Sequence, residues 1–153
     1  MREQKITFEE AMPLILEKLQ SGGEVLFSPS GVSMRPTLQE GRDSLVLVAP
    51  PAKLKKYDIA LFKRENGQYV LHRVIKVGES YTFIGDNQYA YEEGIRPDQI
   101  IALCAAYVRD GKRVSLDSFG ARAFARFWHH TRLLRRVWRK IRALSTPHTP
   151  DHQ

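Results

Sequence analysis

The sequence predicts a mainly β protein: a partly closed antiparallel β barrel or two-sheet core, with a short helix before it and a long basic amphipathic helix after it. Strand-like runs separated by turn-forming residues fill the middle of the chain, over residues 24–116. Apolar residues at helical spacing lie on both sides of that region. A chain of 153 residues, 42% of them hydrophobic, has room for one domain with a substantial core.

The first element predicted is a helix over Phe8–Leu19. Apolar side chains recur along it at helical spacing: Met12, Ile15, Leu16 and Leu19. Thr7 and Glu10 have the arrangement of a capping box, in which each side chain accepts a hydrogen bond from the backbone of the other residue. The glycine pair 22–23 then ends the helix.

Strand-like runs follow the helix. In chain order they are EVLFS, SLVLVA, DIALFKR, QYVLHRVIKV, SYTFIG, QIIALCAAYV and KRVSL. Turn-forming pieces such as ENG, VGES and RDG separate several of these runs at hairpin distances. Hairpin spacing predicts antiparallel pairing, so we expect these runs to form the β core of a domain spanning residues 1–118.

The spacing becomes helical again after residue 118, and a basic amphipathic helix is predicted over residues 119–145. One side gathers Phe124, Phe127, Trp128, Leu134, Trp138 and Ile141; the other gathers Arg122, Arg132, Arg136, Arg139 and Lys140. The segment 119–144 holds eight basic residues and no acidic one, which leaves the rest of the chain nearly neutral. The polar, proline-bearing segment 146–153 is expected to be a flexible tail.

The apolar face of this helix needs a cover, and three are considered. The helix packs on its own β core, as amphipathic helices of soluble proteins do, or it binds an anionic membrane surface, as interfacial helices do. The sequence is compatible with both of these covers. Nucleic acid ranks lower, because the arginines belong to a single helix without a recognised base-contacting motif.

The composition also bears on cofactors and compartment. Cys104 is the only cysteine, so the chain can form neither an internal disulfide nor a cysteine zinc site, and we expect Cys104 to be buried in packing. No cofactor or metal is expected. No window reaches the roughly 18 apolar residues of a membrane span, and acidic residues interrupt the N-terminal apolar pattern. We therefore expect a cytoplasmic protein, or one peripheral to a membrane.

The segment SPSGVSMRPTL carries the first candidate for chemistry, Ser33. Gly31 and Pro36 flank it in a pattern that suits a turn presenting a hydroxyl at a sheet edge, with backbone N–H groups left free. Taken by itself, a serine in such a turn is ordinarily just a turn residue. A catalytic role would need a neighbouring base, because a serine hydroxyl is a weak nucleophile at neutral pH.

His72 is the candidate base. It lies in the predicted strand QYVLHRVIKV, where the period of two puts Val70, His72, Val74 and Lys76 on one face. The other histidines belong to the basic helix or the tail: His129, His130, His148 and His152. Without a partner, a strand histidine is ordinarily a packed or surface residue.

Taken together, the motifs resemble a known family. SGVSMRPTL, RDSLVLV, KKYDIALFKR, VLHRVI and FIGDNQ resemble, in this order, the successive boxes of signal peptidases, and the first also resembles the self-cleaving repressors of the same serine-peptidase clan. The resemblance covers Glu24–Leu116. It implies that Ser33 is the nucleophile and His72 the general base, as in histidine-type members of the clan. The chain differs from signal peptidases in having no predicted membrane span.

The resemblance also suggests accessory residues. Asp86, in the box GDN, is favoured as an acid that orients His72 or holds structure, ahead of Glu92 and Glu93. Lys76 is the less favoured base. Two further aspartates match family boxes and are expected to be structural: Asp43 and Asp58.

The resemblance implies a serine endopeptidase that cleaves an extended peptide or precursor segment with a Ser–His dyad. The alternative is a catalytically inactive peptidase-fold module that binds a partner protein, a membrane surface or nucleic acid through its basic helix.

Overall fold

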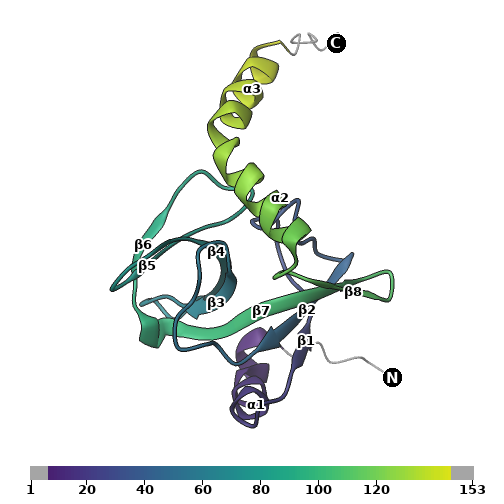
Figure 1. Cartoon of the computed structure of the whole chain (residues 1–153), viewed down its shortest axis with the longest axis vertical. Coiled ribbons are helices and arrows are strands. Elements are labelled where there is room, and N and C mark those ends of the chain that lie inside the picture. The colour runs from purple at the N-terminus through teal and green to yellow at the C-terminus, as the bar shows by residue number, and fades with distance from the viewer. Residues whose placement is uncertain (1–6, 146–153) are drawn as a thin grey trace, which may run out of the picture.

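The computed structural model describes residues 7–145 and is built around an antiparallel sheet of eight strands (Figure 1). The elements in chain order are α1 (Phe8–Gln20), β1 (Val25–Phe27), β2 (Asp43–Val48), β3 (Ile59–Lys63), β4 (Tyr69–Val77), β5 (Tyr81–Ile84), β6 (Glu92–Ile95), a 3-10 turn (Pro97–Gln99), β7 (Ile100–Arg109), β8 (Lys112–Ser115), α2 (Phe119–His130) and α3 (Arg132–Leu144). The strand order is β1-β2-β7-β3-β4-β5-β6, and β8 pairs with β7. The mainly β class and the flanking helices are confirmed.

Every strand-like run of the sequence forms a strand, and one strand was missed. The missed strand is β6, whose sequence EEGI is charged and contains glycine, so it carries no strand pattern. Pairing with β5 forms it, through the registers Tyr81↔Ile95 and Phe83↔Glu92. A neighbouring strand, rather than local preference, therefore makes this segment extended.

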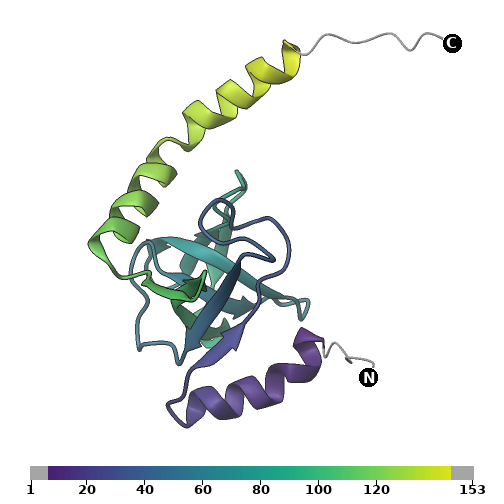
Figure 2. The same cartoon turned by 90° about the vertical axis from the view of Figure 1, so that its right-hand side faces the viewer.

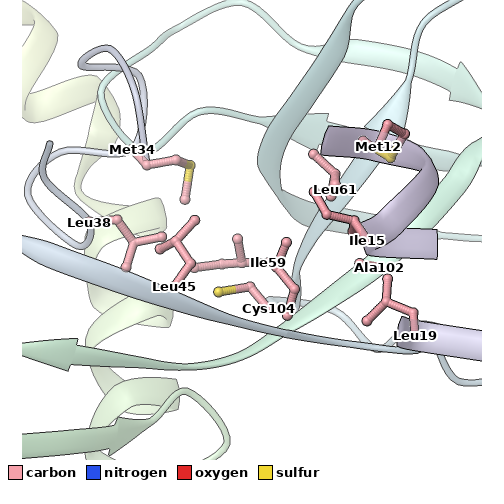
Figure 3. Close-up of a cluster of buried hydrophobic side chains, with 11 residues drawn as sticks. Met12, Ile15, Leu19, Met34, Leu38, Leu45, Ile59, Leu61, Ala102 and Cys104 are labelled. Carbon is pink, nitrogen blue, oxygen red and sulfur yellow. The ribbon is translucent and has the colours of Figure 1, made fainter. Parts of the chain in front are cut away.

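Helix α1 begins where its capping box predicts. The Thr7 N–H donates to Glu10 Oε2 at 2.8 Å, and the Glu10 N–H donates to Thr7 Oγ1 at 3.3 Å. The helix buries Met12, Ile15 and Leu19 in a cluster with side chains from the sheet (Figure 3). Each fully buried side chain of this size contributes about 1.5–3 kcal/mol, so α1 is held by packing.

Strand β4 divides its side chains between two clusters. Tyr69 and Leu71 pack against the α1 cluster, whereas Val70 and Val74 pack into a second cluster that contains Phe62 and Phe83. The predicted alternation of two faces is confirmed over this stretch. The register with β5 shifts between Val74 and residue 76, which marks a bulge at that end of the strand.

The single C-terminal helix predicted over 119–145 is wrong in one respect: α2 ends at His130, and α3 begins at Arg132. The break is at Thr131, whose hydroxyl donates to the Phe127 carbonyl at 2.9 Å. A threonine that hydrogen-bonds back into the preceding turn bends a helix. Such a bend leaves the spacing of the apolar residues unchanged, so the sequence pattern does not reveal it.

Helix α2 is attached to the β core, whereas α3 extends away from it (Figure 2). Ala125 is buried, Trp128 Nε1 donates to the Asp86 carbonyl at 2.8 Å, and Arg122 pairs with Asp58 at 2.7 Å. No residue of α3 is buried. No helix within residues 7–145 is long and apolar enough to cross a membrane. The predicted tail, 146–153, lies outside the described residues.

Candidate functional site

Ser33 lies in the turn that follows β1. Gly31 has a φ of 79°, a left-handed conformation that favours glycine and lets the chain reverse before the serine. The buried Met34 side chain anchors the turn in the core. Within residues 7–145, the backbone N–H groups of Ser33 and Met34 donate to no protein acceptor. The turn therefore presents a half-buried serine beside two available N–H donors.

The loop after β5 supports this turn. The Asn87 N–H donates to the Ser33 carbonyl at 2.8 Å, and the Asn87 side chain donates to the Val32 carbonyl at 3.2 Å. Gly85 permits this close approach, because a Cβ there would lie 2.7 Å from the Ser33 carbonyl oxygen. Gly85 and Asn87 of the GDN box thus hold the serine turn in place.

His72 is fixed in the middle of the sheet. It lies in β4 opposite Ala60 of β3 and is 3% exposed. His72 and Ser33 line the same cavity, of about 370 Å³, which we call the Ser33–His72 cavity. Its wall also includes Met34, Leu38, Tyr69 and Gln88. No hydrogen bond joins the serine hydroxyl to the imidazole in the described part of the chain, although both residues line the cavity.

The imidazole is neutral at physiological pH. Burial lowers the pKa of His72 below its ordinary value of 6.5, and the nearby Glu92 carboxylate offsets this effect only in part. His72 Nδ1 lies 3.4 Å from Glu92 Oε1. The orientation of the pair does not meet hydrogen-bond geometry, and Nδ1 is buried with no other partner among residues 7–145. The Glu92 contact is therefore electrostatic in this state.

Glu92 is kept ionised by an arginine. Arg64 binds both carboxylate oxygens, with Nε donating to Oε2 at 2.9 Å and Nη2 donating to Oε1. This hydrogen bonding lowers the pKa of Glu92. Arg64 also lines the Ser33–His72 cavity. Arg64 ends the box KKYDIALFKR but was not singled out from the sequence, because it reaches Glu92 only through the pairing of β6 in the sheet.

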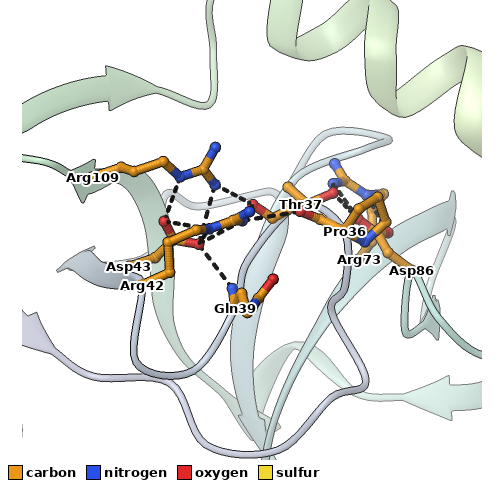
Figure 4. A network of polar contacts seen from close by, with 8 residues as sticks. All are labelled: Pro36, Thr37, Gln39, Arg42, Asp43, Arg73, Asp86 and Arg109. Carbon is orange, nitrogen blue, oxygen red and sulfur yellow. Dashed lines mark hydrogen bonds and ion pairs between the residues drawn. The ribbon is translucent and has the colours of Figure 1, made fainter.

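The preference for Asp86 over Glu92 as the acid beside His72 is not supported by the contacts. Asp86 is buried and binds Arg73 through two hydrogen bonds of 2.7 Å each (Figure 4). It also accepts a hydrogen bond from the Thr37 hydroxyl. These partners use both oxygens of the carboxylate. These contacts fit the structural interpretation of Asp86, and the acid that lies beside His72 is Glu92.

Asp43 lies in the same network of polar contacts as Asp86, linked to it through Thr37 (Figure 4). Its carboxylate accepts hydrogen bonds from Arg109, Arg42 and the Gln39 N–H. Burial raises the pKa of Asp43, but the hydrogen bonds from Arg109 and Arg42 outweigh it and hold the pKa at about 2. This network joins the segment after Ser33 to β7, as expected of a structural aspartate.

The remaining candidates lie apart from the cavity or are chemically inert. Asp58 binds the Lys55 N–H and Arg122, which is a structural arrangement. Lys76 is exposed and does not line the Ser33–His72 cavity. Burial raises the pKa of Cys104 to about 12, so it stays a thiol. Within residues 7–145, no cluster of acidic, histidine or cysteine side chains could hold a metal ion.

Comparison with known proteins identifies no relative. The chain matches no protein-family model, and searches of curated proteins and of solved structures find no significant match. The residues of the Ser33–His72 cavity are therefore the basis for a functional proposal.

Proposed function

We propose that this protein is a serine endopeptidase in which Ser33 is the nucleophile and His72 the general base. One observation carries the proposal: the two residues, far apart in the chain, line one cavity. Of the described histidines, His72 alone belongs to the sheet, since His129 and His130 lie at the end of α2. The motif resemblance assigns the same pair.

The chemistry follows from the state of each group. His72 is neutral, so it can accept the Ser33 proton as the hydroxyl oxygen bonds to the substrate carbonyl carbon. The proton then passes to the leaving amine as the peptide bond breaks, and water hydrolyses the acyl-enzyme by the reverse use of His72. The N–H groups of Ser33 and Met34 are donors for the oxyanion. Catalytic hydrogen bonds are often long in unliganded sites. Substrate binding would therefore bring the Ser33 hydroxyl and the His72 imidazole within hydrogen-bond distance.

Glu92 completes the arrangement as a positioning residue. A carboxylate beside Nδ1 favours the tautomer with the proton on Nδ1, which leaves Nε2 able to accept the Ser33 proton. It also stabilises the imidazolium that forms during the reaction. Arg64 keeps the carboxylate ionised and oriented. The proposed dyad thereby becomes a Ser33–His72–Glu92 triad.

The proposed peptidase core is partly closed, and its substrate is an extended peptide. The Asn87–Ser33 hydrogen bond supports closure, because it connects the turn after β1 to the loop between β5 and β6, at opposite ends of the strand order. Strand β1 pairs with β2 alone among the described strands. Its other edge can accept a peptide strand, which would lead directly to Ser33.

Incubation with a library of unstructured peptides, followed by mass spectrometry of the products, tests this function. The wild type is expected to cut internal peptide bonds, and Ser33→Ala is expected to cut none while melting at the same temperature. Ser28→Ala is the matched control, because Ser28 is an exposed serine of the same segment that does not line the Ser33–His72 cavity. Equal cleavage by Ser33→Ala would contradict the proposal, and absence of cleavage by any variant would favour the inactive binding module.

A further inference from the structure

Helix α3 presents a continuous apolar surface to solvent. Its apolar side chains are all exposed, from 54% for Ile141 to 87% for Leu144. Two phenylalanines of α2 are exposed as well: Phe119 is 91% exposed and Phe127 is 62% exposed. We call this set the outer face: Phe119, Phe127, Leu133, Leu134, Val137, Trp138, Ile141 and Leu144. A soluble protein rarely exposes so many large apolar side chains together, which marks the outer face as a binding surface.

The opposite side of α3 is fixed against the protein. The Arg132 guanidinium lies 4.4 Å from the centre of the Tyr91 ring, and that of Arg135 lies 3.5 Å from the Trp128 ring. Arg139 donates to Asn87 Oδ1 at 3.3 Å. These contacts determine how the helix is rotated about its axis. The apolar side chains consequently point away from the β core, which excludes that core as their cover.

Basic side chains border the outer face. Arg126, Lys140 and Arg142 form no ion pair within residues 7–145. Arg142 lies over the ring of Trp138, at 4.9 Å. The segment 119–144 contains no acidic residue. The occupant of the outer face must therefore accept apolar side chains at its centre and supply negative charge at its border.

We propose that the outer face of α2 and α3 docks on the surface of an anionic lipid membrane. An anionic bilayer offers an acyl region for Trp138 and Ile141 and headgroup phosphates for the bordering cations. A second copy of the chain would oppose two segments that each carry eight basic residues and no acidic one, which is repulsive. Nucleic acid would neutralise the arginines but leave the apolar side chains in water. Of the three, only the membrane satisfies both features.

Vesicle flotation of the full chain tests the proposal. Vesicles of phosphatidylcholine with phosphatidylglycerol should bind the protein, and vesicles of phosphatidylcholine alone should bind it far less. Raising the salt from about 0.01 M to about 0.15 M shortens the Debye length from about 30 Å to about 8 Å, so binding should weaken. Lys140→Gln should weaken it about fivefold, because one basic residue near such a surface contributes about 1 kcal/mol.

An apolar substitution and a matched control distinguish docking through the outer face from non-specific adsorption to vesicles. Ile141→Ser should weaken binding to anionic vesicles by about tenfold or more, because it removes the burial of one apolar side chain. Leu14→Ser is the control, since Leu14 is an exposed leucine of α1, 67% exposed. Wild-type binding by both Ile141→Ser and Lys140→Gln would overturn the proposal. Two results without vesicle binding would also overturn it. Self-association that Ile141→Ser abolishes would indicate a second copy of the chain as the occupant, and binding of duplex DNA would indicate nucleic acid.

Discussion

Replacing Asp86 by asparagine should strongly destabilise the protein. The side chains of Asp86 and Arg73 are 3% and 6% exposed, and the substitution keeps the shape of Asp86 while leaving the Arg73 charge buried without its counter-ion. Breaking one side of a buried ion pair costs about 3–5 kcal/mol. A chain of this size loses about 2–4 °C of melting temperature per kcal/mol, so Asp86→Asn should lower it by about 10 °C.

Urea unfolding and thermal melting, followed by circular dichroism, measure this loss. Asp98→Asn is the matched control, because Asp98 forms an ion pair with Arg96 on the surface and its side chain is 69% exposed. That control should change the stability little, because an exposed ion pair contributes little to the free energy of unfolding. If Asp86→Asn were as stable as Asp98→Asn and instead changed the pH dependence of activity, Asp86 would be the acid that orients His72 and the structural assignment would be refuted.

Three further predictions concern the carboxylates and the serine turn. Glu92→Gln should lower kcat at least about tenfold. It should also shift the acidic limb of the pH–rate profile to lower pH, because the charge that raises the pKa of His72 is lost. An unchanged profile would show that Glu92 does not act on His72. The Asp43 pKa of about 2 lies below its ordinary value of 3.8, so Asp43 should stabilise the fold above about pH 4 and lose that effect as the pH falls to about 2. In urea titrations, the free energy of unfolding of Asp43→Asn should therefore depend less on acid pH than that of the wild type. Gly85→Ala should displace the Ser33 carbonyl and destabilise the protein by about 1–3 kcal/mol, measured by urea unfolding, and unchanged stability would contradict the close contact.

Local sequence signals predicted most of the fold. The capping box located the start of α1, and alternation in β4 placed Val70 and Val74 on one face. Strand β6 escaped because its extended form depends on pairing with β5. The bend at Thr131 escaped because a side-chain hydrogen bond to the helix backbone leaves the apolar period intact. Both misses arise where a specific contact, rather than residue preference, decides the conformation.

The candidate site divides in the same way. Ser33 and His72 were predicted from motifs, and the structure places both at one cavity. For the acid, Asp86 has the more recognisable motif, but the buried Arg73 binds its carboxylate. Glu92 reaches His72 through β6, the strand without a sequence pattern. Only tertiary contacts distinguish Glu92 from Asp86 as the acid beside His72.

The account's central claim is that His72 activates Ser33, and covalent labelling by a fluorophosphonate probe tests it most directly. Intact-mass and peptide mapping should find one adduct, on Ser33, in the wild type and in the control Ser28→Ala. Ser33→Ala should remain unlabelled, and His72→Ala should react at least about a hundredfold more slowly. The labelling rate should fall as the pH drops below 6.5 through the lowered pKa of His72. An adduct elsewhere, or equal labelling of His72→Ala, would contradict the claim.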